Sequence, residues 1–323
     1  MSCARSRWAA VLLAALLALP GRSFAQSDAA TACPPEPLPL DAARFERGMR
    51  EATDHGFLWR VARDGRSSYL YGTIHAARPE WMFPGPRTAA ALAGSDTLAL
   101  ELDLLDPDVQ ARLVTGLRAR AATPLPAPLA ARLERRLVAE CLDPAAWRAL
   151  APEFQIATLS VMAGRRDGLD PSYAVDLVLA LAARDLGKTI VSLETPEAQI
   201  AALKMATPPE TIEFVTSGLD ELESGRTRPL LAHLAAAWSG SDVAELEAYE
   251  RWCDCLRNAA DRASMKRLLD DRNEPLAAAI DALHGGGKKV FAAVGALHMV
   301  GPNGLPALLR LRGYTVEQVG FDR

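Results

Sequence analysis

The order of short apolar segments along the chain constrains its fold more than any other feature. Apolar, β-rich runs alternate with longer stretches whose apolar residues recur at helical spacing, as Val109 and Leu113 do. This alternation predicts an α/β fold with a mostly parallel central sheet and helices packed on it. Asp64-Gly65-Arg66 predicts an N-terminal hairpin, and large helical insertions are expected over one end of the sheet. The expected strands cover residues 57–62, 68–74, 97–102, 189–193, 289–294 and 314–319.

Residues 1–25 are expected to be a signal peptide. Arg5 and Arg7 give a positively charged start, residues 8–19 form an apolar run, and small residues precede a cleavage site after Ala25. The protein is therefore predicted to be exported, to the periplasm or the cell exterior. We expect no stable membrane span, because no apolar run reaches the roughly 20 residues of a transmembrane helix.

The rest of the chain is expected to consist of a flexible leader, residues 26–56, and a single α/β domain, residues 57–323. Half of all residues are hydrophobic and 24% are charged, which excludes intrinsic disorder. The formal net charge of −4 argues against nucleic acid as a partner, since a nucleic-acid binder needs a basic face.

Four cysteines remain after the predicted cleavage. An even number in an oxidising compartment indicates one or two structural disulfides, and the sequence does not select among the three possible pairings. Cys253-Asp254-Cys255 is too closely spaced for a C-x-x-C zinc or redox motif. The four are Cys33, Cys141, Cys253 and Cys255.

Four polar residues each follow an apolar run: His75, Glu101, Glu194 and His298. In open α/β sheets, ligands bind at the carboxyl ends of the strands. Two imidazoles and two carboxylates meeting there would suit a divalent cation. Gly-x-x-His closes two of these runs, and glycine allows close backbone approach just before each histidine.

Each of these residues also has a purely structural interpretation. A single histidine after a strand is commonly a hydrogen-bonded rim residue. Glu194-Thr195-Pro196 is typical of the start of a helix. The repetition on four strands favours a functional site. Asp176, in an otherwise apolar helix, must have a partner, because an unpaired buried carboxylate is costly.

Further motifs surround these residues: Tyr71-Gly-Thr-Ile-His75, Leu100-Glu-Leu-Asp103, Gln199, Asp271-Arg-Asn273 and Gly295-Ala-Leu-His298. In this order the chain resembles the TraB/GumN family, which includes the Tiki-type metallopeptidases, from about residue 57 to 319. That family is similar in fold to the erythromycin esterases and the haem-binding ChaN-like proteins. The resemblance implies a metal site at the four polar residues.

The function expected from the residues and the resemblance is an exported metal-dependent hydrolase acting on peptide or protein substrates. A divalent cation (Mn, Co or Zn) held by His75, Glu101, Glu194 and His298 would lower the pKa of its bound water. One of the two glutamates would act as general base, and the sequence does not decide which. Arg272 would stabilise the tetrahedral intermediate. The alternative is a non-enzymatic periplasmic binding or regulatory protein for haem, a metal or a peptide signal.

Overall fold

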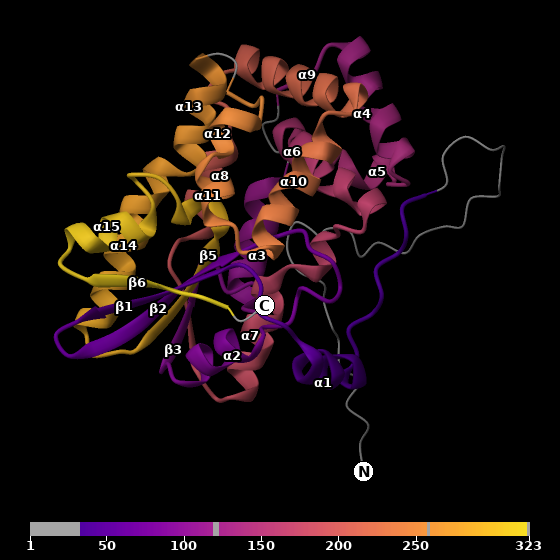
Figure 1. Cartoon of the computed structure of the whole chain (residues 1–323). Helices are drawn as coiled ribbons and strands as arrows, with labels where there is room; N and C mark the ends of the chain where they lie inside the picture. Colours follow the sequence, from indigo (N-terminus) through magenta and orange to yellow (C-terminus); the bar gives the residue numbers. More distant parts are fainter. Residues whose placement is uncertain (1–32, 119–122, 257–258, 322–323) are drawn as a thin grey trace.

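The computed structural model of the chain describes residues 33–118, 123–256 and 259–321. The predicted signal peptide, residues 1–25, lies outside these residues, so its cleavage stays a prediction. Within the described residues, strands and helices alternate along the chain as the sequence predicts (Figure 1).

Six strands form one central sheet: β1 (Phe57–Arg63), β2 (Arg66–Thr73), β3 (Thr97–Leu100), β4 (Thr189–Ser192), β5 (Val290–Gly295) and β6 (Thr315–Val319). Their order in the sheet is β4-β3-β5-β2-β1-β6. The neighbours β4, β3, β5 and β2 are parallel, whereas β1 pairs antiparallel with both β2 and β6. The prediction of an α/β fold with a mostly parallel sheet is confirmed.

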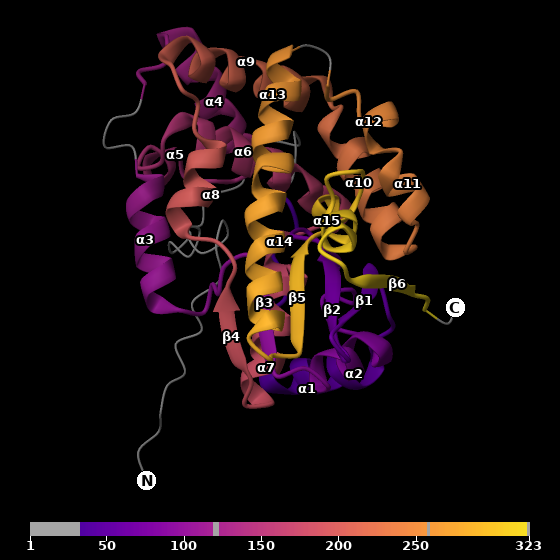
Figure 2. The same cartoon turned by 90° about the vertical axis from the view of Figure 1, so that its left-hand side faces the viewer.

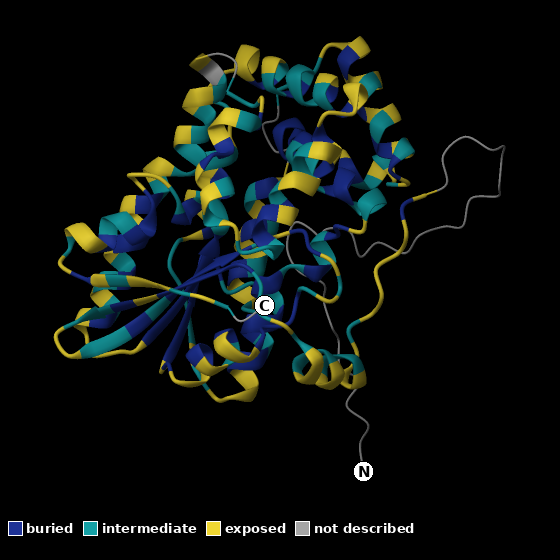
Figure 3. Ribbon diagram, viewed as in Figure 1, coloured by how far each residue is buried: buried dark blue, intermediate teal, exposed yellow. Residues whose placement is uncertain are grey.

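The predicted hairpin joins β1 to β2 through a two-residue turn between Arg63 and Arg66. Both turn residues have positive φ, 53° at Asp64 and 72° at Gly65, as the twist of a tight hairpin favours. Further into the sheet, β3 and β5 are buried along their whole length, which is typical of parallel strands covered on both faces. Figure 3 shows this buried core at the sheet.

The helices are α1 (Ala42–Glu51), α2 (Pro86–Ala93), α3 (Pro107–Leu117), α4 (Ala127–Ala139), α5 (Pro144–Trp147), α6 (Pro152–Met162), α7 (Val175–Asp185), α8 (Pro196–Leu203), α9 (Pro208–Ser224), α10 (Thr227–Ser239), α11 (Val243–Glu247), α12 (Tyr249–Trp252), α13 (Ala259–Leu268), α14 (Asp270–Gly285) and α15 (Leu305–Leu311). Short 3-10 turns are η1 (Ala163–Asp167), η2 (Pro171–Tyr173) and η3 (Ala296–Met299). In the part of the chain that the structure describes, no helix has the length and apolar character needed to cross a bilayer.

The helices form two groups around the sheet. In both Figure 1 and Figure 2, α14 and α7 lie on opposite faces of the sheet, while α4, α6, α9 and α13 lie beyond one end of it. The second group has its own hydrophobic core, built around Leu133, Phe154, Leu159 and Leu219. The helical insertions therefore lie over one end of the sheet, at the edge where the parallel strands finish.

Two helix starts show how local sequence directs the chain at this edge. Thr195 caps α8 by accepting a hydrogen bond from the Ala198 N–H, and Pro196 occupies the first turn, as predicted. The chain before α7 forms a separate short turn. Asp170 caps the short turn η2, and α7 begins only at Val175.

The stretch predicted to be a flexible leader, residues 26–56, contains the helix α1 among its described residues. Phe45 and Met49 of α1 pack against a hydrophobic cluster that includes Phe83. Upstream of α1, the Leu38 N–H donates a hydrogen bond of 2.8 Å to the Tyr173 hydroxyl. The described part of this stretch therefore contacts residues far along the chain.

The cysteines form two disulfides. Cys33 pairs with Cys141 across 108 residues, which ties the segment before α1 to the end of α4. Cys253 pairs with Cys255 across a separation of only two residues, and Asp254 between them has a φ of +48°. The structure thus selects one of the three pairings that the sequence left open.

Candidate functional site

The carboxyl ends of β2, β3 and β5 bring three of the four predicted polar residues to one point. A methyl group placed on Gly295 would lie 3.3 Å from Glu101 Oε1, 3.4 Å from His75 Nε2 and 3.6 Å from His298 Cδ2. The two imidazoles are therefore within about 7 Å of each other. Glycine at this position leaves room for all three side chains to converge.

Glu194 joins the cluster because β3 and β4 continue to pair beyond their last strand residues. The Leu193 N–H donates to the Leu100 carbonyl at 2.8 Å, and the Glu194 N–H donates to the Glu101 carbonyl at 3.1 Å. This register places the two glutamates on neighbouring segments. The Gln199 amide, one turn into α8, donates to Oε2 of both carboxylates at 3.1 Å.

Arg272 of α14 lies between the two glutamates and His298. It holds Glu194 side-on, with Nε 2.9 Å from Oε1 and Nη2 2.6 Å from Oε2. Nη2 also donates to Glu101, and Nη1 donates to His298 Nε2 at 3.2 Å and to the Leu268 carbonyl at 2.9 Å. These five hydrogen bonds match the five N–H groups of a guanidinium, so the arrangement leaves none for a substrate oxygen.

Asn273, next to Arg272, decides which ring nitrogen of His298 carries the proton. The Asn273 amide nitrogen donates to the Asn303 carbonyl at 2.8 Å, so its oxygen faces His298 Nδ1, 2.6 Å away. An acceptor opposite Nδ1 requires the proton there, which leaves the Nε2 lone pair to accept from Arg272.

His298 is neutral at physiological pH. Burial lowers its pKa, the adjacent Arg272 guanidinium lowers it further, and the nearby carboxylates offset only part of this, so the pKa falls to about 4. The ring is 3% exposed. Because the buried Nε2 of His298 accepts a hydrogen bond from Arg272, protonation of Nε2 is unfavourable.

His75 differs from His298 in both its partner and its charge. Its Nδ1 lies 3.1 Å from Asp176 Oδ2, and Thr73 donates to Asp176 Oδ1 at 3.0 Å. Burial alone lowers the pKa of His75, but Asp176 and Glu101 raise it more, to about 9. The side chain is nevertheless 60% exposed, because it faces an open pocket. Asp176, which we expected to have a partner, therefore has two, His75 and Thr73.

Glu101 is ionised throughout the physiological range. Burial raises its pKa, while His298, Arg272, His75 and the Gly295 N–H lower it more, to about 2. The Gly295 N–H donates to Oε1 at 2.8 Å. Oε1 lies 3.9 Å from His75 Nε2, so the carboxylate of Glu101 and the imidazole of His75 lie next to each other.

An apolar pocket of about 230 Å³ begins at His75 and Glu101. Its walls come from α3, α6, α7 and α8, and most of its lining is Leu, Ile, Val and Met. His75, Glu101, Asp176 and Gln199 form its polar end. Such a pocket, apolar with convergent polar groups at one end, is the usual form of a small-molecule or substrate site.

The divalent cation implied by the resemblance does not fit these residues as they are arranged. Arg272 uses one oxygen of Glu101, both oxygens of Glu194 and the lone pair of His298, which are the atoms that a metal would need. Among the described residues, no group of three or more His, Cys, Asp and Glu side chains is spaced to hold a metal ion. The guanidinium already supplies a positive charge at this place.

Some residues singled out from the sequence lie elsewhere. Asp103, of the motif Leu100-Glu-Leu-Asp103, pairs with Arg184 at 3.3 Å. Met82 and Phe83, in the loop after His75, are buried in a hydrophobic cluster. Asn273 and Gln199 could be singled out from the sequence only as parts of the family motifs, and their roles follow from the contacts in the structure.

Fold and site together define an α/β protein with a charged cluster at the carboxyl edge of its parallel strands. A model of the TraB/PrgY/gumN family matches residues 57–318, so the chain belongs to this family, as its motifs predict. Comparison with curated proteins and with solved structures found no match.

Proposed function

We propose that this chain is an exported hydrolase that cleaves amide bonds of peptides at the pocket bordered by His75 and Glu101. The observation that carries the proposal is their pairing: Nε2 and Oε1 lie 3.9 Å apart at the polar end of an apolar pocket. A proton donor beside a proton acceptor on a pocket wall is what hydrolysis by general acid–base catalysis requires.

Glu101 is assigned as the acceptor of the proton of the attacking water. It borders the pocket, whereas both oxygens of Glu194 are held by Arg272. With a pKa of about 2, Glu101 is a weak base. The proton transfer therefore depends on stabilising the charge that develops on the substrate carbonyl oxygen.

His75 is assigned as the donor. Its pKa of about 9 keeps the ring protonated at neutral pH, and Asp176 stabilises that cation. In one cycle, water gives a proton to Glu101 and its oxygen to the carbonyl carbon. The carbon–nitrogen bond then breaks, and the leaving nitrogen takes the proton of His75. Transfer of a proton from Glu101 to His75 restores both groups.

Arg272 is assigned a positioning role. All five of its hydrogen bonds go to Glu101, Glu194, His298 and the Leu268 carbonyl, so it holds Glu101 in place and does not contact the substrate. Because the residues around it do not fit a metal in this arrangement, no step of the proposed reaction passes through one.

The exported location is proposed from the N-terminal sequence and the cysteines. Residues 1–25 have the charge and apolar pattern of a signal peptide. The pairs Cys33–Cys141 and Cys253–Cys255 have disulfide geometry, and such bonds persist mainly outside the reducing cytosol. Fractionation of cells that express the full chain tests this part of the proposal.

The test of the reaction is a digest of a peptide library, read by mass spectrometry. We expect Glu101→Gln and His75→Gln to lower the rate about a hundredfold or more. Glu197, a surface carboxylate on α8, does not line the pocket that begins at His75 and Glu101. Glu197→Gln is therefore the matched control and should cleave like the wild type. A wild type that binds peptides without cleaving any would replace the proposal with its alternative, a non-enzymatic binding or regulatory protein.

A further inference from the structure

The pocket that begins at His75 and Glu101, called the inner pocket below, is apolar beyond its polar end. Leu113 and Leu117 of α3, Val161 and Met162 of α6, and Leu203 of α8 form its walls. Thr158, a polar residue in this part, donates its hydroxyl to the Phe154 carbonyl at 2.7 Å. A charged group placed here would lose its hydration with no partner in return, whereas an apolar group would gain from burial.

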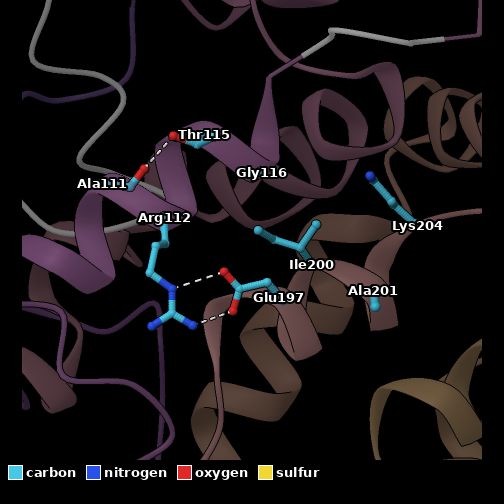
Figure 4. A pocket seen from close by; sticks show the side chains of 8 residues that line it. All are labelled: Ala111, Arg112, Thr115, Gly116, Glu197, Ile200, Ala201 and Lys204. Atoms are coloured by element: carbon cyan, nitrogen blue, oxygen red, sulfur yellow. Dashed lines mark hydrogen bonds and ion pairs between the residues drawn. The ribbon is translucent and has the colours of Figure 1, made fainter.

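An outer groove lies on the other side of the same wall. It is lined by faces of α3 and α8 that point away from the inner pocket, including Arg112, Glu197 and Lys204. Figure 4 shows Arg112 paired with Glu197 across the two helices, with Ile200 close to Gly116. Ile200 lines both the outer groove and the inner pocket, so its side chain separates them.

Gly116 explains how Ile200 comes to fill this position. A methyl group on Gly116 would lie 2.2 Å from Ile200 Cδ1, so with alanine there the end of the isoleucine side chain would have to move away from α3. Glycine is less favourable than alanine inside a helix, yet glycine occupies this position in α3. Ile200 is 6% exposed, and it lines both the inner pocket and the outer groove.

We propose that the inner pocket binds a large aliphatic side chain next to the cleaved bond, and that Ile200 sets the depth of the pocket. The substrate class is therefore peptides with Leu, Ile or Met at that position. This inference rests on the proposed hydrolase function. The pocket opens directly onto His75 and Glu101, so a side chain seated in it presents its own backbone to these two residues.

The experiment uses peptides that differ at one position, carrying Ala, Leu, Met, Trp, Asp or Lys there, and compares cleavage rates. Discrimination by an apolar pocket reaches about ten- to two-hundredfold, so we expect the wild type to prefer Leu over Ala at least tenfold. Val161→Phe fills the pocket and should remove this preference. Ile200→Ala joins the pocket to the outer groove and should admit Trp. Lys204→Ala, which changes only the outer groove, is the control.

A second measurement separates this inference from the proposed reaction. The apolar fluorophore N-phenyl-1-naphthylamine is bound to each variant and displaced by the Leu or Asp peptide. The apolar subsite is supported if the Leu peptide displaces the fluorophore, the Asp peptide does not, and this difference is lost in Val161→Phe. This holds even if no peptide is cleaved. Cleavage of Asp or Lys peptides as fast as Leu peptides overturns the subsite and leaves the hydrolase standing. If no peptide is cleaved and none displaces the fluorophore selectively, both the hydrolase function and the apolar subsite are overturned.

Discussion

Arg272 holds Glu194 side-on, with Nε 2.9 Å from Oε1 and Nη2 2.6 Å from Oε2. The same guanidinium reaches Glu101 and His298, so one side chain from α14 connects the carboxyl ends of three strands. A permanently charged group thus stands where the family resemblance led us to expect a metal ion. The stability of the cluster should depend on it.

Replacing Arg272 with alanine should leave two buried carboxylates without their cation. We expect the free energy of unfolding to fall by about 3–5 kcal/mol, as when one partner of a buried ion pair is removed. The vacated space would then lie among two carboxylates and an imidazole. Excess Mn²⁺ or Zn²⁺ should raise the melting temperature of Arg272→Ala but not of the wild type or the surface control Arg262→Ala. Tight, stoichiometric metal binding by the wild type would contradict this account.

The reaction should lose rate above about pH 9, where His75 gives up its proton. Asp176→Asn removes the main cause of the raised pKa, so the alkaline limb of the pH–rate profile should move towards lower pH. The raised pKa also stabilises the fold: this contribution is complete below pH 6.5 and is lost as the pH rises through about 9. Asp185→Asn, at the far end of α7, should leave the profile unchanged. An unmoved alkaline limb in Asp176→Asn would refute the role of His75.

Acid should destabilise the protein in two steps. The pKa of His298 falls from 6.5 to about 4 on folding, so stability present above pH 6.5 is lost as the pH drops towards 4. Glu101, with a pKa lowered from 4.5 to about 2, loses its contribution below pH 4.5. Urea denaturation at a series of pH values measures both steps. Stability that is constant between pH 7 and 4 would contradict the first.

Asn273→Asp should remove the first of these steps. A carboxylate opposite Nδ1 favours the imidazolium and raises the pKa of His298. NMR titration of the ring nitrogens would show Nδ1–H, Nε2-unprotonated His298 in the wild type at pH 7. In the variant it should show a ring that takes a second proton at higher pH. Asn303 contacts Asn273 through its backbone carbonyl and not through its side chain. Asn303→Asp is therefore the control. The opposite tautomer in the wild type would be inconsistent with the bond to Arg272.

Gly295→Ala should lower activity at least tenfold with little loss of secondary structure. The added methyl group would lie 3.3 Å from Glu101 Oε1 and 3.4 Å from His75 Nε2, so both would have to shift, and small displacements of reacting groups are costly. Gly285→Ala, where the nearest atom is 3.9 Å away, is the matched control. Equal activity in the two variants would show that the convergence at Gly295 is not needed for function.

The Cys33–Cys141 disulfide should matter far more to stability than Cys253–Cys255. It closes a loop across 108 residues, and removing a bond of this kind typically costs 2–5 kcal/mol. The other bridge spans two residues, so it restrains the unfolded chain little. Denaturant unfolding of Cys33→Ser/Cys141→Ser and Cys253→Ser/Cys255→Ser should differ accordingly, and equal losses would contradict this explanation.

The sheet and its polar edge could be predicted because their signals are local. Three signals can be read along the chain: apolar runs of strand length, the hairpin turn at Asp64 and Gly65, and a polar residue directly after an apolar run, as at His75, Glu101 and Glu194. A parallel sheet then places the residues that follow its strands at one edge. Family membership followed from the spacing of the same motifs.

The sequence by itself determined that His75, Glu101, Glu194 and His298 lie at one edge of the sheet, since strand ends follow from short-range patterns of apolar and polar residues. Only the tertiary structure decided what they do there. Arg272 arrives from α14, Asn273 sets the tautomer of His298, and Asp176 sets the charge of His75. Each of these effects depends on distances of about 3 Å between side chains far apart in the sequence, and packing alone sets such distances.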